Sequence, residues 1–403
     1  MLYNIGIRSY GLAVRVASLF NEKAKLWIAG RKDYWNNLPD VKNRNVVWFH
    51  CSSLGEYDQG KPIMERWRIE HPEDYILVTF FSPSGYENIK DKSVGDYTCY
   101  LPLDTPKNAE KFIQHFQPKN SFFIKYEIWI NYINEAKKHG SKVYSISASF
   151  RENQRFFKWY GQNFRNALKQ FDHIFVQKES SKALLNKIDI TAVTVSGDTR
   201  YDRVIQRAQE NRENAIIAPW VEGEQVFIVG SSWAPDEEII IPYINDFKIQ
   251  NRVIIAPHDV NESRIKEITS KLKVSYQLYT KVQKGEALKP FTTVLIMDCI
   301  GVLAEAYRYG NLAYVGGGFG TGLHNILEPA AFGLPVIFGP KFKKFPEAQD
   351  FIDAEIGNSC DDGKSFYDAY TYYLGNKQAT ERVKNFVNSQ KGATEIIMQK
   401  VVK

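Results

Sequence analysis

The sequence predicts an α/β protein built from two doubly wound domains with parallel sheets. Short β-branched or aromatic runs alternate with helical stretches along most of the chain, which is the pattern of a parallel sheet covered by helices on both faces. A polar, aperiodic interval at 206–224 interrupts the alternation, which then restarts. The length of 403 residues is also too great for one ordinary core, so two domains are the natural expectation.

The individual elements follow from these runs. The strands predicted in the first half are Val46–His50, Tyr75–Phe81, Ser121–Ile124, Lys142–Ser147, His173–Val176 and Thr191–Val195. Helices are predicted between them at Lys61–Glu70, Lys107–Phe116, Asn131–His139 and Ser180–Lys187. The strands predicted in the second half are Gln225–Val229, Arg252–Ile255, Val294–Met297, Leu312–Val315 and Pro335–Phe338, and the tail Ala379–Lys403 is helical in period.

These elements divide the chain into four parts. Residues 1–35 form a basic, amphipathic segment, 36–208 a first α/β domain, 209–380 a second α/β domain, and 381–403 a C-terminal helix that can pack back on the first domain. Doubly wound domains bind ligands beyond the carboxyl ends of their strands. The sequence therefore predicts a ligand site in the cleft between the two domains.

Charge and cysteine content narrow the classes of function. The net charge is +6, and residues 1–32 carry six basic residues against one acidic residue. Because the excess is not spread along a groove, a nucleic-acid partner is not expected. The cysteines at 51, 99, 299 and 360 show no C-x-x-C pairing and no His at ligand spacing, and no D-x-D motif is present. A structural zinc site and a metal-dependent reaction are therefore not predicted.

The first twenty residues form an apolar stripe beside two basic side chains. No uninterrupted apolar run reaches the length of a membrane span, and no signal-peptide cleavage pattern follows. A helix would place Arg8 and Arg15 beside an apolar face made of Ile5, Leu12, Val16, Leu19 and Phe20. This pattern fits a helix lying in a membrane interface, and it fits a first helix packed on the core equally well. The sequence leaves both readings open.

The stretch 314–340 carries the strongest ligand-binding signal. A predicted strand ends near Val315, glycines follow at 316, 317, 318, 320 and 322, and a helix is predicted to carry His324, Asn325 and Glu328. Glycines let a backbone approach a ligand closely, and a helix start attracts phosphate. Glu328 is placed to accept hydrogen bonds from ribose hydroxyls. A tight turn whose glycines serve packing is the alternative, and we favour nucleotide binding over it.

A second candidate lies at Val47–Tyr57, where a predicted strand gives way to a loop of small residues and then to a helix. Glu56 beside Gly55 at this helix start is placed to take a proton in the cleft. A first-turn acid that only complements the helix dipole fits equally well. Ser52 and Ser53 lack a G-x-S-x-G context, so N-capping is the expected use of these hydroxyls.

Several of these segments, taken in order, resemble the 3-deoxy-D-manno-octulosonic acid (Kdo) transferases, which build lipopolysaccharide in Gram-negative bacteria. The motifs that carry the resemblance are HCSSLGE at 50–56, YEIWIN at 126–131, SGDTRYD at 196–202, GSS at 230–232, DCIGVL at 298–303 and GGGFGTGLHNILEPAAFG at 316–333. The resemblance extends over about residues 1–360. It implies a GT-B glycosyltransferase that moves Kdo from CMP-Kdo to a lipid A precursor with inversion and without a metal cofactor. It also implies a place on the cytoplasmic face of the inner membrane, reached through the N-terminal segment.

The resemblance also implies roles for single residues. Glu56 matches the general base, with Ser53, Gly55 and Glu127 on the acceptor side. The donor-side matches are Ser231, Ser232, His258, the backbone of Ile300, Gly301 and Val302, and Gly316, Gly317, His324, Asn325 and Glu328. We expect His324 either to contact phosphate or to cap its loop. Lys178 and Arg200 are candidate cations for acidic groups of either substrate, although each fits a solvated surface charge better.

Four positions depart from the family pattern. Lys125 stands where the family often has an acid, and Pro257 stands where an Arg is expected before His258. Trp233 replaces a frequent His, and Leu323 replaces a common Gly. These changes bear on substrate contacts more than on the class of enzyme. The alternatives are another GT-B glycosyltransferase, a nucleotide-sugar epimerase, and a non-catalytic protein that binds nucleotide sugars.

Overall fold

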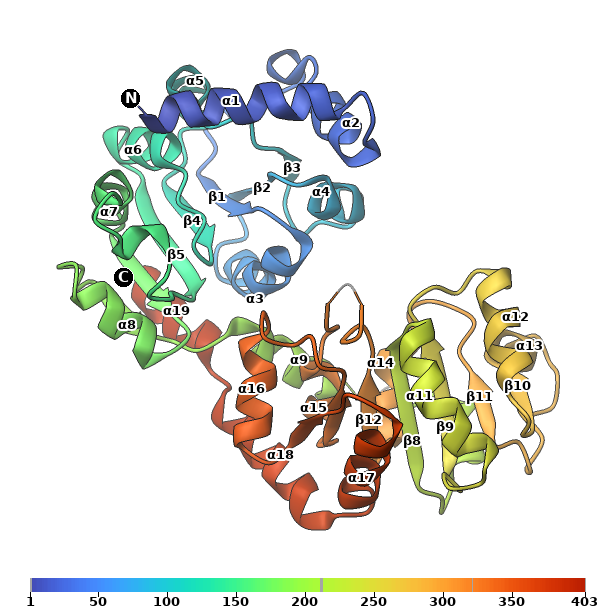
Figure 1. Cartoon of the computed structure of the whole chain (residues 1–403). Helices are drawn as coiled ribbons and strands as arrows, with labels where there is room; N and C mark the ends of the chain where they lie inside the picture. The colour runs from blue at the N-terminus through green and yellow to red at the C-terminus, as the bar shows by residue number, and fades with distance from the viewer. Residues whose placement is uncertain (1, 211–212, 321, 403) are drawn as a thin grey trace. The chain divides into compact units, whose positions relative to one another are not determined.

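The computed structural model describes residues 2–210, 213–320 and 322–402. The chain divides into two compact units. The first unit comprises the residues up to Asp202 together with those from Lys391 onward, and the second comprises Arg203 to Gln390. Helix α9 (Thr199–Gln209) passes through the point of division. Each unit is an α/β fold in its own right (Figure 1).

The first unit is built on a parallel sheet of seven strands in the order β3-β2-β1-β4-β5-β6-β7. The strands are β1 (Val46–Cys51), β2 (Tyr75–Phe80), β3 (Tyr97–Tyr100), β4 (Asn120–Ile124), β5 (Lys142–Ala148), β6 (His173–Val176) and β7 (Val193–Val195). Its helices are α1 (Leu2–Ala17), α2 (Glu22–Ala29), η1 (Tyr34–Asn36), α3 (Leu54–Glu70), α4 (Pro83–Ile89), α5 (Pro106–Phe116), α6 (Ile130–Lys138), η2 (Arg155–Phe157), α7 (Gln162–Leu168), α8 (Glu179–Asn186) and α19 (Ala393–Val401).

Alternate residues of the central strands supply the two cores of this unit. Val46 and Trp48 of β1 point to the face covered by α5, α6, α7 and α8. Val47 and Phe49 point to the opposite face, where α3, α4 and α19 pack. Because successive side chains of a strand point to opposite faces, a strand with helices on both sides is apolar throughout. This is why β1 is buried at all six positions.

The second unit repeats the architecture with strand order β10-β11-β9-β8-β12-β13-β14. Its strands are β8 (Val226–Ser232), β9 (Arg252–Pro257), β10 (Tyr276–Leu278), β11 (Val294–Ile296), β12 (Leu312–Val315), β13 (Val336–Phe338) and β14 (Gly357–Ser359). Its helices are α10 (Ile217–Trp220), α11 (Ala234–Asn245), α12 (Glu262–Lys271), α13 (Tyr279–Gln283), α14 (Leu303–Ala306), η3 (Tyr307–Tyr309), α15 (Leu327–Ala331), α16 (Pro346–Asp353), α17 (Gly363–Tyr373) and α18 (Lys377–Ser389). Helices α11, α12 and α17 pack on one face, and α10, α13 and α14 pack on the other.

The strands that the sequence did not predict are β3, β10 and β14, which lie at sheet edges. Each has only three or four residues, and β14 has the sequence Gly-Asn-Ser. An edge strand pairs on one side only and need not be apolar, so it lacks the run by which the central strands were recognised. The prediction of one continuous helix in the tail Ala379–Lys403 is also wrong. Gly392, with φ of 101°, separates α18 from α19.

The order of strands places the predicted site loops side by side within each unit. In the first unit the direction of winding changes between β1 and β4, which pair in parallel. In the second unit it changes between β8 and β12. A crevice opens where the connections from two adjacent strands leave in opposite directions, and this is where doubly wound sheets bind ligands. The loops that begin at Ser52 and Lys125 flank the first such point, and those that begin at Trp233 and Gly316 flank the second.

The N-terminal helix α1 carries Ile5, Leu12 and Val16 of the predicted apolar stripe, and Leu19 and Phe20 lie in the turn that follows it. The five stripe side chains are between 52 and 87% exposed. The opposite side of α1 packs on the unit. The hydroxyl of Tyr3 donates a hydrogen bond to Asp104, and Gly11 packs so closely on Leu103 that a Cβ there would lie 2.7 Å from it. The reading in which the stripe packs on the core is therefore wrong. Among the described residues, none of the helices has the length and apolar character needed to cross a bilayer.

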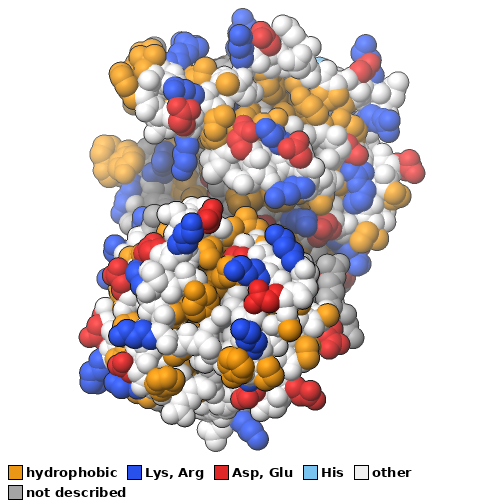
Figure 2. Space-filling model, turned by 90° about the vertical axis from the view of Figure 1, so that its right-hand side faces the viewer, with side chains coloured by type: hydrophobic (Ala, Val, Ile, Leu, Met, Phe, Trp, Pro, Cys, Tyr) orange, Lys and Arg blue, Asp and Glu red, His pale blue; other side chains and the backbone are white. Residues whose placement is uncertain are grey.

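Figure 2 shows one face of the molecule, on which basic side chains are scattered among acidic and apolar ones.

Candidate functional site

Two carboxylates meet at the switch point of the first unit. Glu56 lies in the first turn of α3, which follows β1, and Glu127 lies in the loop between β4 and α6. Ser52 joins them, because its backbone N–H donates to Glu56 Oε2 and its hydroxyl donates to Glu127 Oε2. Glu127 also accepts a hydrogen bond of 2.9 Å from Trp129 Nε1. The fold thus brings together two acids that are 71 positions apart in the sequence.

The environment makes Glu56 an unusually weak acid. Burial raises its pKa to about 8, and the neighbouring charge of Glu127 acts in the same direction. Lys125 and the N–H groups of Ser52 and Ser53 oppose this rise only in part. Burial raises the pKa of Glu127 as well. A carboxylate whose pKa lies near the working pH can accept a proton in one step and release it in the next, as a general base must.

The neighbours of Glu56 leave room for a substrate. A Cβ at Gly55 would meet no atom within 4 Å. Ser53 occupies the N-cap position of α3, but its hydroxyl makes no capping hydrogen bond, so the predicted capping role is wrong for this side chain. Lys125 adopts a left-handed backbone conformation with φ of 61°, and its charge lowers the pKa of both carboxyl groups.

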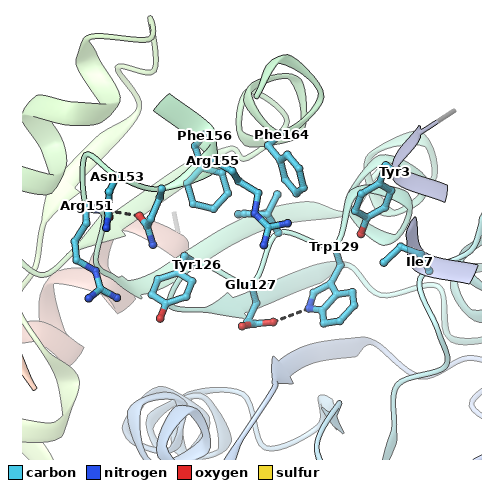
Figure 3. Close-up of a pocket in the computed structure, with 12 residues that line it drawn as sticks. Tyr3, Ile7, Tyr126, Glu127, Trp129, Arg151, Asn153, Arg155, Phe156 and Phe164 are labelled. Atoms are coloured by element: carbon cyan, nitrogen blue, oxygen red, sulfur yellow. Dashed lines mark hydrogen bonds between the residues drawn. The ribbon is translucent and has the colours of Figure 1, made fainter. Parts of the chain in front are cut away.

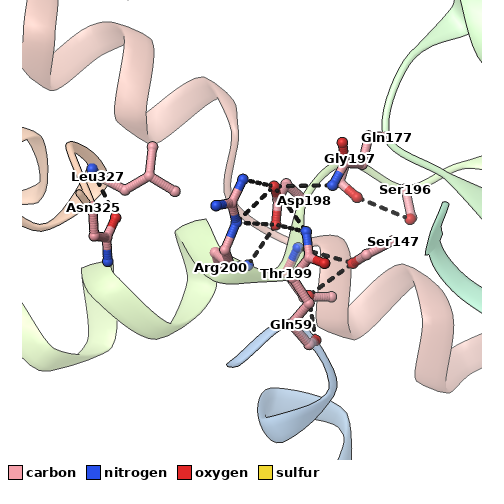
Figure 4. A network of polar contacts seen from close by, with 10 residues as sticks. All are labelled: Gln59, Ser147, Gln177, Ser196, Gly197, Asp198, Thr199, Arg200, Asn325 and Leu327. Carbon is pink, nitrogen blue, oxygen red and sulfur yellow. Dashed lines mark hydrogen bonds and ion pairs between the residues drawn. The ribbon is translucent and has the colours of Figure 1, made fainter. Parts of the chain in front are cut away.

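A buried polar network holds the helix that carries Glu56 (Figure 4). Asp198 forms an ion pair of 2.7 Å with Arg200 Nη2 and accepts a hydrogen bond of 3.0 Å from Gln177 Nε2. Gln59 of α3 donates to the same carboxylate, and its backbone carbonyl accepts the hydroxyl of Thr199 at 2.5 Å. Arg200 is thereby engaged within the protein. Its role as a substrate cation, already the weaker reading in the sequence, finds no support in this geometry.

The predicted donor residues of the second unit line one edge of its sheet. Strands β11, β9, β8 and β12 are consecutive neighbours, so the loops at their carboxyl ends lie in the same order. Ile300, Gly301 and Val302 follow β11, and His258 follows β9. Ser231 and Ser232 end β8, and Gly316 follows β12. Backbone hydrogen bonds join two of these loops, since His258 N donates to Ser232 O at 3.0 Å.

The turn before α14 has the geometry of an anion site. The backbone N–H groups of Ile300, Gly301 and Val302 have no hydrogen-bond acceptor within the part of the chain that the structure describes. Gly301 has a φ of 100°, and Ile300 is 86% exposed. Successive N–H groups left free by a turn with one left-handed residue form a concavity suited to a phosphate.

The glycine loop after β12 is built differently from the prediction. The N–H of Gly316 donates to Gly230 O at 2.9 Å, and that of Gly317 donates to Asp236 Oδ2 at 3.0 Å. A Cβ at Gly316 would lie 2.3 Å from the carbonyl oxygen of Ser231. These two glycines therefore serve close backbone packing, and their N–H groups are already used inside the protein.

Asp236 is the residue that organises this loop, and the sequence analysis missed it. Its carboxylate is fully buried and accepts hydrogen bonds from Trp233 N, Tyr314 Oη and Gly317 N. It thus ties the start of α11 to β12 and to the glycine loop. The available signal was its position three residues after Trp233 at a helix start, where an acid reaches back to the N-cap backbone.

His324 and Asn325 do not lie on a helix, which corrects the prediction. Helix α15 has only five residues and begins at Leu327, and Asn325 Oδ1 caps it by accepting the N–H of Leu327 at 3.0 Å. Pro329 follows so closely that the helix cannot be extended backward in a regular form. His324 Nε2 instead accepts a hydrogen bond of 3.0 Å from Trp233 Nε1, and its ring stacks on His258 at 4.4 Å.

Glu328 lies in the first turn of α15 and forms an ion pair that the sequence did not indicate. Arg207 Nη1 of α9 lies 3.7 Å from Glu328 Oε1. Ser232 is similarly engaged, since its hydroxyl donates to Glu237 Oε1 at 2.8 Å, and Glu237 is paired with Arg264. Several predicted donor residues are thus already ordered by contacts inside the second unit. Among the described residues, no group of three or more His, Cys, Asp or Glu side chains forms a metal-binding cluster.

Comparison with known families gives a match in the first unit. Residues 28–203 match the family model described as 3-deoxy-D-manno-octulosonic-acid transferase (kdotransferase). This range contains Glu56, Glu127 and the network around Asp198. The resemblance predicted from the motifs is thereby confirmed.

Curated relatives extend the similarity beyond that range. A 3-deoxy-D-manno-octulosonic acid transferase of Chlamydophila psittaci is 28% identical over 371 residues, covering 88% of this chain and 82% of the relative. One of Rickettsia bellii is 26% identical over 353 residues, covering 85% and 82%. Both alignments span the two units.

Solved structures confirm the predicted fold class. The crystal structure of UDP-GlcNAc 2-epimerase from Neisseria meningitidis, bound to UDP-GlcNAc, superposes with a TM-score of 0.62 and 14% identity, covering 89% of this chain and 99% of that one. Two Rossmann-like domains with parallel sheets, as in the GT-B class, are therefore common to both.

Proposed function

Since the chain is a glycosyltransferase that resembles the Kdo transferases over most of its length, we propose that it transfers Kdo from CMP-Kdo to a lipid A precursor with inversion, in lipopolysaccharide synthesis. The observation that carries the proposal is the buried carboxylate pair at the switch point of the first unit. It lies in the range matched by the family model and has the raised pKa of a general base.

The proposed reaction is a direct displacement at the anomeric carbon of the donor. Glu56 takes the proton from a sugar hydroxyl of the acceptor as that oxygen bonds to the anomeric carbon. The bond from this carbon to the phosphate oxygen breaks, and CMP leaves with the electron pair. One base suffices for inversion, since no covalent intermediate forms that would need a second carboxylate. Glu127, Ser53 and Gly55 bound the space in which the acceptor hydroxyl would lie.

The donor would be held by the second unit. The free N–H groups at 300–302 are suited to the phosphate, whose charge grows as the bond breaks. Glu328 would accept the ribose hydroxyls, with Arg207 Nη1 3.7 Å from its carboxylate. In this proposal backbone dipoles stabilise the leaving group without a metal ion, and transfer at an undiminished rate in the presence of a chelator is the expected result.

The direct test is incubation of the full chain with CMP-Kdo and a tetraacylated lipid A precursor, followed by mass spectrometry of the lipid. We expect the mass of the lipid to increase by one or more Kdo residues. Unchanged lipid together with protection of the protein against heat by a UDP sugar, and not by CMP, would favour another nucleotide-sugar enzyme. Binding of CMP without consumption of the donor would favour a sensor.

We also propose that the exposed stripe of α1 and the turn after it rests in the cytoplasmic surface of the inner membrane. The stripe is exposed and Arg8 and Arg15 flank it, so apolar insertion and attraction to anionic headgroups act together. The doubly substituted variant Leu12→Ser, Phe20→Ser should lose most of its flotation with vesicles containing phosphatidylglycerol. Ile69→Ser is the matched control, because Ile69 is 74% exposed on α3 of the same unit and lies outside the stripe. Equal flotation of all three proteins would remove the stripe from membrane binding.

A further inference from the structure

A pocket of about 620 Å³ opens beside Glu127 in the first unit. Its wall comes from four segments that are distant in the sequence. They are the first turns of α1, the loop from Tyr126 to Trp129, the loop that leads into η2, and α7. Figure 3 shows Glu127 on the floor of this pocket, where its carboxylate meets the ring of Trp129. A ligand in the pocket would therefore reach Glu127, the member of the carboxylate pair that lines it.

The pocket carries an excess of positive charge that the protein does not neutralise. Arg151 and Arg155 both line it and are exposed, and neither forms an ion pair among the described residues. Figure 3 shows both guanidinium groups turned toward the side where Tyr126 and Glu127 lie. The carboxylate of Glu127 already accepts two hydrogen bonds, from Ser52 and Trp129. The donors of the two guanidinium groups thus remain available to a ligand.

The loop that carries these arginines is held in place by the fold. Phe156 is buried, and Arg165 Nη1 donates to the carbonyl oxygens of Phe156 and Lys158 at 3.0 and 2.7 Å. A Cβ at Gly161 would lie 2.0 Å from the carbonyl oxygen of Arg155, so the chain packs tightly on itself here. The Arg155 guanidinium lies 4.9 Å from the ring centre of Phe164. A preorganised cation loses little side-chain entropy when it binds an anion.

Five aromatic side chains also line the pocket, beside Ile7, Ile128, Asn153 and Gln154. The side chains are Tyr3, Tyr126, Trp129, Phe156 and Phe164. Such rings offer flat apolar faces with polar edges, which suit the mixed surface of a sugar. Two guanidinium groups match the double charge of a phosphate monoester better than the single charge of a carboxylate, and their planar donors fit phosphate oxygens.

We propose that this pocket binds a phosphate monoester on a sugar of the acceptor, with Arg151 and Arg155 holding the phosphate and the aromatic wall holding the ring. The proposal rests on the proposed function and deepens it, because it states how the acceptor is presented to Glu56. The phosphate anchors the acceptor while a hydroxyl of the saccharide lies at the carboxylate pair. Arg151 and Arg155 then take the role of cations for an acidic group of the substrate, for which the sequence suggested only Lys178 and Arg200.

The test compares phosphorylated lipid A precursor with forms that lack one or both phosphates. Arg151→Gln and Arg155→Gln should each raise KM for the phosphorylated acceptor about tenfold, since a charge-assisted hydrogen bond contributes roughly that much, with kcat changed less than about twofold. Toward the acceptor without phosphate, wild type and variants should have the same KM. Arg44→Gln is the matched control, because Arg44 is an exposed arginine of the same unit that does not line the pocket.

The outcomes separate this proposal from the proposed function. Suppose that wild type transfers Kdo and that the arginine substitutions raise KM equally for every acceptor, or do not raise it at all. The pocket then does not bind the phosphate, and the proposed function stands. If wild type transfers to no acceptor, NMR titration of the full chain with glucosamine 1-phosphate decides about the pocket. Weaker binding in both arginine variants and unchanged binding in Arg44→Gln would uphold it. Equal binding in all four proteins would overturn it.

Discussion

Replacing Glu56 with Gln should lower turnover by a factor of about 10²–10⁴ and leave the fold intact, which is the usual loss when a general base is removed. Gln keeps the size of the side chain and can still accept the N–H of Ser52, but it cannot take a proton from the acceptor hydroxyl. The measurement is kcat with CMP-Kdo and the lipid A precursor, together with circular dichroism. Glu179→Gln is the matched control, since Glu179 is an exposed acid in the first turn of α8 in the same unit. Turnover of the Glu56 variant equal to that of the control would remove Glu56 from the chemistry.

The same substitution should stabilise the protein in alkaline solution. Burial raises the pKa of Glu56 from about 4.5 to about 8, so the folded chain keeps a proton that the unfolded chain releases between these values. The free energy of unfolding of wild type therefore falls as pH rises through this window. That of Glu56→Gln does not fall for this reason, because Gln has no proton to release. The free energy of unfolding of Glu56→Gln should exceed that of wild type by a few kcal/mol at pH 9 and match it near pH 4. A variant that loses activity while gaining alkaline stability is not simply misfolded.

The pH dependence of wild type follows from the same pKa. A general base acts only when it is deprotonated, so kcat/KM should rise with pH and level off near the raised pKa of Glu56. Glu127 contributes to that raised pKa through its charge, and Glu127→Gln should therefore move the acid limb of the profile to lower pH. An unmoved limb in that variant would show that the titrating group is not Glu56.

The sequence predicted the central strands well because of where they lie in the sheet. Strands such as β1 and β8 are covered on both faces and are apolar over most of their length, whereas β14 at an edge has the sequence Gly-Asn-Ser. The same logic predicted the position of Glu56. A loop after a buried strand, followed by a helix, is a local pattern that a single sequence displays.

The contacts that order the site are not local, and the sequence did not reveal them. Asp236 reaches Gly317 across 81 positions, and Ser52 reaches Glu127 across 75. Nothing near Gly316 or Gly317 indicates that their N–H groups are already used. His324 was placed on a helix because its neighbours fit helical spacing, while Pro329 and the cap at Asn325 confine α15 to five residues. The arginines of the pocket were missed because their loop has no periodic pattern.

Asp198→Ala should destabilise the first unit by about 3 kcal/mol, the cost of leaving a buried ion pair and its hydrogen-bond donors without their acceptor. Arg200, Gln177 and Gln59 would all lose the carboxylate that they share. We expect the lower end of the usual range, because the Arg200 side chain keeps 23% of its surface exposed and can recruit water. Denaturation by urea, followed by tryptophan fluorescence, measures the change. Glu65→Gln is the matched control, since Glu65 forms a partly exposed ion pair with Lys61 on the same helix as Gln59, and its loss should cost less than about 1 kcal/mol.

The destabilisation should depend on pH in the opposite sense to that of Glu56. Burial alone would raise the pKa of Asp198, but the Arg200 guanidinium and the surrounding donors lower it below its usual value of 3.8. A depressed pKa contributes stability above the ordinary pKa and loses it as pH falls through the folded value. The difference between wild type and Asp198→Ala should therefore be full at pH 7 and shrink below about pH 4. A difference that persists undiminished at pH 3 would mean that packing, and not the charge of Asp198, joins the 196–200 segment to the helix that carries Glu56.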